Sequence, residues 1–217
     1  MKPSTIALSL VLLLGGALYL FRAPVFDLMA AWLTADMFID TIPDGDHPGV
    51  AIGEPFPAIR ATLLRPGEDS DDTVLTDIRD LLGERGVLLV ANRSVAWCPY
   101  CMRQLVQLQE HKAAFDAAGI ALVGLTYDPP AEHRAFMTRH GIEFAMLADH
   151  DAYSVKALGI LNADYAPGDE HYGIPDPGMF VIDRQGRIVG KVFVKGYATR
   201  VDATTVLEHA RAALAGP

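Results

Sequence analysis

Cysteine is scarce in this chain of 217 residues. Only two are present, and both stand in the stretch VAWCPYCMRQL, as Cys98 and Cys101. Two cysteines are too few for the disulfide framework that holds small secreted domains together, so packing has to hold this fold. The chain is long enough, and at 51% hydrophobic residues apolar enough, to bury the core of one domain. The spacing of the two cysteines therefore calls for a chemical explanation.

Runs of Lys and Arg are also lacking. Acidic residues outnumber basic residues 27 to 18, which gives a net charge of -9. A nucleic-acid-binding domain needs a basic surface that neutralises phosphates, and this composition does not supply one. Internal repeats and low-complexity tracts are absent as well. Nucleic acid is therefore excluded as an expected partner.

Residues 5–21 contain no charge and lie between Lys2 and Arg22. Seventeen residues are the lower limit for a helix that crosses about 30 Å of hydrocarbon. The stretch ends in Tyr-Leu-Phe, which suits the aromatic belt at a membrane surface better than the small residues of a cleavage site. We expect residues 1–22 to form an uncleaved N-terminal hydrophobic anchor helix. A cleaved signal peptide, which would leave a secreted protein, and a buried helix are the alternatives.

The rest of the chain divides into a juxtamembrane segment with a linker, residues 23–49, and a domain, residues 50–217. The linker is predicted by DTIPDGDHPG, residues 40–49, a cluster of Pro, Gly and Asp. Hydrophobic patterns in the domain predict strands near residues 59–64, 87–94, 120–128, 144–149, 179–183 and 187–196, and helices near residues 102–118, 129–141, 150–159 and 202–215. Strands that alternate with helices indicate an α/β domain around a central, at least partly parallel sheet.

The cysteine pair falls between a predicted buried strand and a predicted amphipathic helix. Cys98 is therefore expected at the helix N-terminus, where free N–H groups and the helix dipole lower a thiol pKa from about 8.5 into the range of ~3.5 to 7.5. Pro99 is favoured in the first helical turn, because its missing N–H costs nothing there. Cys101 lies one turn into the helix, with its sulfur on the same side. This order makes Cys98 the expected nucleophile and Cys101 the resolving thiol of a redox-active disulfide.

Other interpretations of the pair are weaker. A structural disulfide that closes so short a loop adds little stability. A zinc site needs two further ligands, and only scattered histidines such as His133 and His140 are available. Haem attachment needs a histidine directly after the second cysteine, where Met102 stands. We therefore expect thiol-disulfide chemistry, with neither a metal nor a cofactor.

Several segments agree in order with a known family. IGEPFPAI resembles its entry motif, VLLVANRSVAWCPYC its strand running into Trp-Cys-x-x-Cys, LTYDPPAEHRAF its next strand and helix, and IPDPGMFVIDRQGRIV its last motif. Residues 50–214 thus resemble the thioredoxin-fold redoxins, which comprise the alkyl hydroperoxide reductase/thiol-specific antioxidant group and the membrane-tethered TlpA-like thiol-disulfide reductases. The resemblance implies a thioredoxin-like α/β fold, with a central mixed sheet flanked by helices.

The resemblance also implies residues that position a substrate beside the cysteines. In this family a cis-proline before the last motif's strand faces the cysteine pair. The spacing to Phe180 favours Asp176-Pro177 over Pro175 as that bond. Trp97 is expected to pack over the dithiol. The dipeptide Pro99-Tyr100 is the one familiar from glutaredoxins, although this chain is far longer than a glutaredoxin.

Two departures from the family favour one of its branches. Typical peroxiredoxins carry Pro at seven residues and Thr at three residues before the peroxidatic cysteine, and here those places hold Ala91 and Val95. A hydrocarbon side chain cannot make the hydrogen bond that orients a peroxide. We therefore expect a thiol-disulfide oxidoreductase that acts on partner proteins outside the cytoplasm. A peroxiredoxin-like thiol peroxidase and a non-catalytic binding module are the alternatives.

The expected partners are protein thiols and disulfides, together with a membrane-bound electron donor. An anchor over residues 5–21 would place the domain at a bacterial-type inner membrane, facing the periplasm or the cell exterior. Asp128 and Asp149 end predicted strands, and each is expected to cap the helix that follows. His171 and Tyr172 lie near the expected cis-proline loop and are weaker candidates for the site.

Overall fold

The computed structural model describes residues 29, 32–45, 47–68 and 73–216. Contacts within the chain divide it into residues 1–36 and residues 37–217. In the first unit, Trp32 and Leu33 lie at the end of a helix and are exposed. The predicted anchor over residues 5–21 lies outside the described residues. Among the described residues, no helix has both the length and the apolar character needed to cross a membrane.

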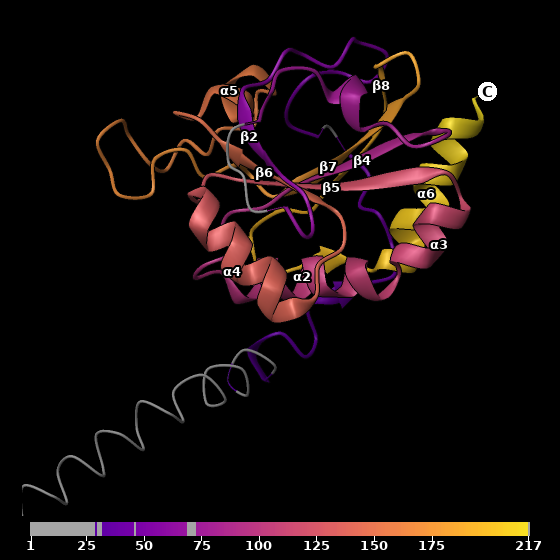
Figure 1. The fold of residues 1–217 in the computed structure, drawn as a ribbon. Coiled ribbons are helices and arrows are strands. Elements are labelled where there is room, and N and C mark those ends of the chain that lie inside the picture. Colours follow the sequence, from indigo (N-terminus) through magenta and orange to yellow (C-terminus); the bar gives the residue numbers. More distant parts are fainter. Residues whose placement is uncertain (1–28, 30–31, 46, 69–72, 217) are drawn as a thin grey trace, which may run out of the picture. The chain divides into compact units, whose positions relative to one another are not determined.

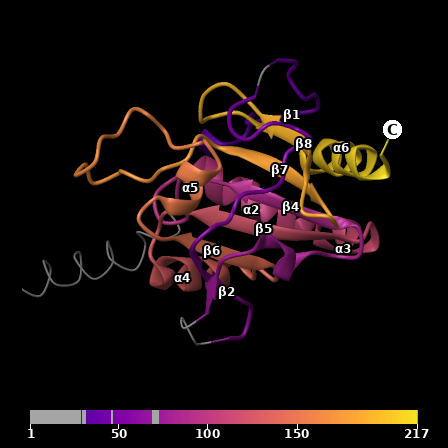
Figure 2. The same ribbon diagram turned by 90° about the horizontal axis from the view of Figure 1, so that it is seen from above.

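A seven-stranded mixed sheet forms the centre of the second unit (Figure 1). Its strands run in the order β3 (Val74–Leu75), β2 (Ala61–Leu64), β6 (Ala145–Asp149), β5 (Ile120–Thr126), β4 (Gly86–Ala91), β7 (Gly178–Asp183) and β8 (Ile188–Phe193). The strands β4, β5 and β6 are parallel, and the strands on either side of these three are antiparallel. Figure 2 shows β2, β6, β5, β4 and β7 side by side. This is the α/β architecture that the sequence predicts.

Both faces of the sheet are covered. One face packs against α2 (Pro99–Glu110), α3 (Lys112–Ala117), α4 (Pro130–His140) and α6 (Ala203–Ala215). The other face packs against α5 (Tyr153–Ala157) and the 3-10 helix η1 (Ile78–Leu81). In β4, Leu88 and Val90 point to the first face, and Val87 and Leu89 to the second. All six residues of β4 are buried, as predicted for a strand with helices on both sides.

The helical segment after the cysteines is less regular than its sequence pattern predicts. Instead of one helix up to Gly119, α2 ends and α3 begins at His111. The ring nitrogen Nδ1 of His111 lies 2.9 Å from the carbonyl oxygen of Gln107, and the backbone N–H of His111 also bonds to that oxygen. Gly119 ends the segment with φ of 70°, a left-handed conformation that glycine adopts without strain.

The stretch that contains the predicted linker belongs to the second unit, which begins at Met37. Strand β1 (Phe38–Ile39) pairs in parallel with β9 (Arg200–Val201). Farther along the predicted linker, the Nζ of Lys191 donates hydrogen bonds to the carbonyl oxygens of His47 and Pro48, at 2.8 and 3.1 Å. The stretch rich in Pro, Gly and Asp therefore runs along the domain, because its backbone groups find partners there.

Candidate active site

Cys98 ends the loop that joins β4 to α2 and is the N-cap residue of that helix. Its sulfur accepts a hydrogen bond from the backbone N–H of Cys101, at 3.3 Å. Pro99 occupies the first turn, where it breaks no helical hydrogen bond. The prediction that Cys98 lies at a helix N-terminus is therefore confirmed. The two cysteines are joined by a disulfide, with their α-carbons 5.3 Å apart.

Both sulfur-bearing residues are buried in this oxidised form. Cys98 is 2% exposed, and Cys101 is not exposed at all. Trp97 comes directly before them and is 36% exposed, so the surface next to the disulfide is aromatic. Among the described residues, no group of three or more His, Cys, Asp and Glu side chains could hold a metal ion. The chemistry that this arrangement can supply is sulfur chemistry.

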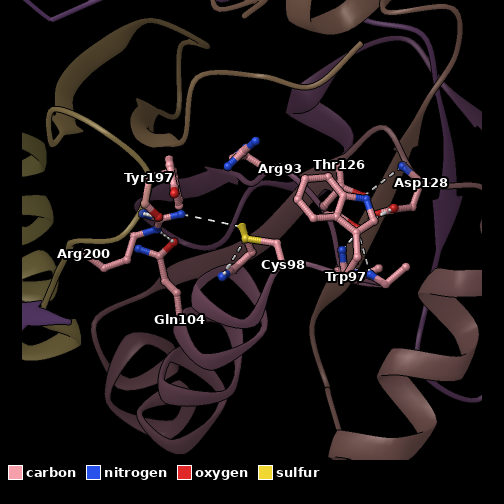
Figure 3. The surroundings of a disulfide bond; sticks show 12 residues. Arg93, Trp97, Cys98, Gln104, Thr126, Asp128, Tyr197 and Arg200 are labelled. Carbon is pink, nitrogen blue, oxygen red and sulfur yellow. Dashed lines mark hydrogen bonds between the residues drawn. A yellow bond between two sulfur atoms is a disulfide. The ribbon is translucent and has the colours of Figure 1, made fainter. Parts of the chain in front are cut away.

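The carboxylate of Asp128 holds the loop that leads to Cys98 (Figure 3). It accepts hydrogen bonds from the hydroxyl group of Ser94 and the backbone N–H of Val95, both at 2.7 Å. The hydroxyl oxygen of Ser94 in turn accepts hydrogen bonds from the N–H groups of Ala96 and Trp97, at 2.9 and 3.2 Å. One side chain from the segment after β5 thereby fixes four consecutive residues of the loop.

The expectation that Asp128 caps the following helix is wrong. Pro129 is the N-cap residue of α4, and no side chain caps that helix. The difference arises because the loop between β4 and α2 brings buried donors within reach of the Asp128 carboxylate. Asp149 is not the N-cap residue of α5 either, since that residue is Ala152, but its carboxylate accepts hydrogen bonds from the N–H groups of Ser154 and Val155 in the first turn, at 2.8 and 3.2 Å. Burial raises the pKa of Asp149 above its ordinary value, although these hydrogen bonds lower it.

Two further buried side chains, Thr126 and His133, continue the hydrogen-bond network of Asp128. Thr126 lies 2.7 Å from the Asp128 carboxylate through its hydroxyl oxygen, and 3.0 Å from Nε2 of His133 through the same atom. Burial lowers the pKa of His133 below its ordinary value. His133 is a component of this packed network, and among the described residues it belongs to no group of three or more side chains that could hold a metal ion.

An aromatic cluster surrounds the indole ring of Trp97. The Trp97 Nε1–H donates to the hydroxyl oxygen of Tyr127 at 3.0 Å, and that hydroxyl group lies 3.3 Å from Nδ1 of His171. The rings of Trp97 and His171 are 5.1 Å apart between centroids. Burial raises the pKa of Tyr127, so its hydroxyl group stays protonated near neutral pH. His171 thus lies in the site, as the sequence suggested, whereas Tyr172 packs beneath the Nζ of Lys156, 5.1 Å from its ring centroid.

Arg93 forms the wall of a cavity beside the disulfide. Its guanidinium carbon lies 5.2 Å from the Trp97 ring centroid and 4.7 Å from the Tyr197 ring centroid, within the range of a cation–π contact. Arg93 and Tyr197 line a cavity of about 640 Å³, together with Asp176 and Pro177. Tyr100 contributes an edge-on contact to Tyr197, with ring centroids 6.1 Å apart. The cavity therefore brings the Asp176-Pro177 segment to the same side of the molecule as the aromatic rings.

The expected cis bond at Asp176-Pro177 is wrong, because no cis peptide bond occurs among the described residues. The backbone before Pro177 is extended and paired. Leu161 and Pro175 form an antiparallel bridge, and the N–H of Asp176 donates to the carbonyl oxygen of Ile160 at 2.7 Å. The side chain of Asn162 also donates to the Asp176 carboxylate, at 3.0 Å. These contacts hold the segment in line with β7.

Arg200 reaches the disulfide from the far end of the sequence. One of its terminal nitrogens lies 3.6 Å from the sulfur of Cys101 (Figure 3). Arg200 is not among the site residues predicted from the sequence, since nothing in GYATRVD distinguishes its arginine from a surface residue. The only available signal was the short β-pattern at Arg200–Val201, and that pattern gives no direction toward the cysteines. The pairing of β9 with β1 is what places it there.

The position that binds peroxide in typical peroxiredoxins is closed here. Val95 stands three residues before Cys98, and its side chain is 3% exposed and packs in the core. Its backbone N–H is already bonded to Asp128. Ala91, at seven residues before Cys98, belongs to β4 and is also buried. Neither residue therefore offers a hydrogen bond to a peroxide.

Comparisons with known proteins agree with the fold. The sequence model of the AhpC/TSA family matches residues 52–191. Alkyl hydroperoxide reductase E of Mycobacterium tuberculosis is 32% identical over 136 residues, which cover 58% of this chain and 83% of that protein. The solved structure of Mycobacterium tuberculosis AhpC superposes with a TM-score of 0.62 at 21% identity, covering 78% of this chain and 95% of that one. Peroxidoxin BcpB from the same organism gives a TM-score of 0.60 at 16% identity, covering 78% of this chain and 97% of that one. The structural likenesses show a thioredoxin-like fold.

Replacement of Asp128 should loosen the loop before Cys98. Asp128→Ala removes the acceptor of three buried donors, and each buried donor left without a partner costs about 1–3 kcal/mol. We expect the free energy of unfolding to fall by about 3 kcal/mol in urea denaturation, since such losses are not fully additive. Amide hydrogen exchange at Val95 and Trp97 should become faster.

Asp149→Ala is the matched control, because it removes a buried aspartate that binds N–H groups in the first turn of α5 instead of binding this loop. It should cost about 1 kcal/mol, as is usual when side-chain hydrogen bonds to a helix N-terminus are lost, and leave exchange at Val95 and Trp97 unchanged. Equal protection of these two amides in Asp128→Ala and in the unmodified protein would contradict the role assigned to Asp128.

Proposed function

Because the chain belongs to the AhpC/TSA family of redoxins, we propose that it is a thiol-disulfide oxidoreductase in which Cys98 and Cys101 alternate between dithiol and disulfide. The observation that carries this proposal is the position of the disulfide in the first turn of α2, with Cys98 as the N-cap residue. At that position the helix end stabilises a thiolate, which is the reactive form of cysteine.

The reaction proceeds through a mixed disulfide. In the reduced protein, the thiolate of Cys98 attacks a sulfur of the partner's disulfide, and the partner's other sulfur leaves as a thiolate. Cys101 then attacks the sulfur of Cys98, which releases the second partner thiolate and closes the disulfide of this protein. The partner gains two electrons and the protein loses two. The same steps run backwards when a partner dithiol reduces the protein.

The surroundings of the pair support a protein partner. The exposed ring of Trp97 lies directly before the buried Cys98, and Arg93 connects it to a cavity that Pro177 and Tyr197 also line. Large aromatic side chains are enriched at protein interfaces, because they bury much surface and lose little side-chain entropy. A partner's chain that lies along this surface would bring its sulfur to Cys98.

Peroxide reduction is a second candidate, favoured by the names of the relatives. Alkyl hydroperoxide reductase E and peroxiredoxin Q of Arabidopsis thaliana both match this chain, the latter at 26% identity over 88 residues. In that reaction Cys98 would be oxidised to a sulfenic acid, and Cys101 would condense with it, releasing water. The closed position at Val95 argues against an efficient reaction. The rate of Cys98 oxidation by hydrogen peroxide distinguishes the two candidates.

We also propose that the protein works outside the cytoplasm, held by residues 5–21. The support comes from the sequence, which has an uncharged stretch between Lys2 and Arg22. Outside the cytoplasm a disulfide would persist, because that environment is oxidising. Attachment to a membrane would raise the effective concentration of the protein for a membrane-bound electron donor.

The two cysteines should behave differently when replaced. Cys98→Ser should abolish exchange with a model disulfide, because it removes the attacking thiolate. Cys101→Ser should instead trap a mixed disulfide with the partner, because nothing then resolves it. Non-reducing gel electrophoresis and mass spectrometry identify the trapped species. If Cys98→Ser keeps full exchange activity, the assignment of roles is wrong, and if neither variant changes anything, a binding module without catalysis is the better interpretation.

Extraction and proteolysis test the location. The full-length chain should stay with the membrane fraction after carbonate extraction, because an apolar helix is not released at high pH. Protease added to intact spheroplasts should digest the domain. Release of the full-length chain into the soluble fraction would contradict the anchor, and protection of the domain from protease would contradict its orientation.

A further inference from the structure

Arg200 is held in one position by the backbone and side chains around it. Its Nε–H donates to the side-chain oxygen of Gln104 at 3.0 Å. One terminal nitrogen donates to the carbonyl oxygens of Tyr197 and Thr199, at 2.7 and 2.8 Å. These three bonds leave the second terminal nitrogen directed at the sulfur of Cys101, 3.6 Å away. The contact is therefore a consequence of a fixed side chain, which has little freedom to turn elsewhere.

This cation is buried without a counter-charge. Arg200 is 4% exposed, and within the described part of the chain no carboxylate is hydrogen-bonded to it or forms an ion pair with it. Burial, with a smaller contribution from the nearby charge of Arg93, lowers the pKa of Arg200 to about 10. It is still protonated at neutral pH. A buried charge is costly unless a group of opposite charge compensates it. Arg200 therefore calls for such a group close by.

We propose that Arg200 is a catalytic residue whose guanidinium group stabilises Cys101 as a thiolate whenever the disulfide opens. The sulfur of Cys101 touches the guanidinium group in the oxidised form, and it becomes an anion of opposite charge when the S–S bond breaks. The pair then forms a buried, hydrogen-bonded ion pair in the reduced protein. This inference rests on the proposed function, since it assigns a role within the same dithiol reaction.

The effect acts on both directions of exchange. When a partner thiolate attacks the sulfur of Cys98, the bond to Cys101 breaks and Cys101 leaves as the thiolate beside Arg200. A leaving thiol with a lower pKa leaves faster. In the opposite direction, Arg200 keeps Cys101 deprotonated, so that it can attack the mixed disulfide at Cys98. The partner's sulfur then leaves as a thiolate, and two electrons are transferred as described above.

Several elements contribute the charged groups around Cys101. Arg200 comes from β9, and Arg93 from the segment after β4. The first turn of α2 carries no acidic residue. Asp128 is bonded to Ser94 and Val95, and Figure 3 shows it on the side of the cysteines opposite Arg200. Asp202 is engaged by Gln107 and by the N–H of Thr204.

A titration of Cys101 alone tests the proposal. In a Cys98→Ser background, the absorbance of the thiolate near 240 nm is followed against pH. Burial by itself would raise the thiol pKa above the ordinary ~8.5, whereas a cation in contact lowers it. We expect a pKa below 8.5 for Cys101, and an increase of about 1 to 3 units when Arg200→Gln is added, as is usual when an opposite charge in contact is removed.

Two further variants separate charge from structure. Arg200→Lys keeps the positive charge and loses the planar guanidinium group. We expect this variant to change the pKa of Cys101 less than Arg200→Gln does. Arg103→Gln removes an exposed charge on the same helix that is paired with Glu110, and it should leave the titration unchanged. A Cys101 pKa of 8.5 or more in the Cys98→Ser protein would overturn the proposal, and so would equal shifts in Arg200→Lys and Arg200→Gln. Should Arg200→Gln fail to fold, the Cys98→Ser value and the Arg200→Lys comparison still decide.

The titration does not depend on exchange activity. If the titration gives the expected values but the protein exchanges no disulfides, the proposed function fails and the role of Arg200 toward the sulfur stands. If exchange proceeds and the titration gives an ordinary pKa, Arg200 has no electrostatic role and the proposed function stands.

Discussion

The hydrogen bonds from the loop before Cys98 to the carboxylate of Asp128 are the interaction on which the rest of the site depends. Strand β4 ends at Ala91 and α2 begins at Pro99, and the seven residues between them have to turn and present Cys98 at the helix end. Asp128 supplies the acceptors that this turn needs, and it does so from the neighbouring strand's end. The parallel pairing of β4 and β5 is what brings the two segments together. The hydrogen bonds from Ser94 and Val95 to this carboxylate hold the end of the loop that carries Cys98.

The electrostatics of the site contrast with those of the whole chain. The protein carries a net charge of -9, yet Arg200 contacts the sulfur of Cys101 and Arg93 contacts the neighbouring Trp97, and no carboxylate among the described residues is hydrogen-bonded to either arginine. One of them, Arg93, faces the cavity through its contacts with Trp97 and Tyr197. The other, Arg200, faces the sulfur. A thiolate that forms at Cys101 during thiol exchange would therefore face a positive charge in spite of the acidic composition of the chain.

Much of the fold could be predicted from the sequence. The continuous apolar stretches at β4 and β5 and the Cys-Pro-Tyr-Cys helix start are local signals, and the structure has them where the sequence placed them. The contacts that complete the site are between distant segments. Asp128 approaches Ser94 because of strand pairing, Arg200 approaches Cys101 because β9 pairs with β1, and the segment before Pro177 pairs with Ile160 and Leu161. Sequence spacing carries no information about such pairings.

Competition between two oxidants tests the central claim most directly. The fully reduced protein is mixed with hydrogen peroxide and with a disulfide-bonded protein at equal concentration, and Trp97 fluorescence and trapped Cys98 adducts are followed in a stopped-flow and quench experiment. The account predicts that the disulfide oxidises Cys98 faster, because Cys98 lies at a helix end beside an aromatic surface, and because Val95 and its N–H offer nothing to a peroxide. A fast, saturable reaction with peroxide that outruns the disulfide would contradict it and make the protein a thiol peroxidase.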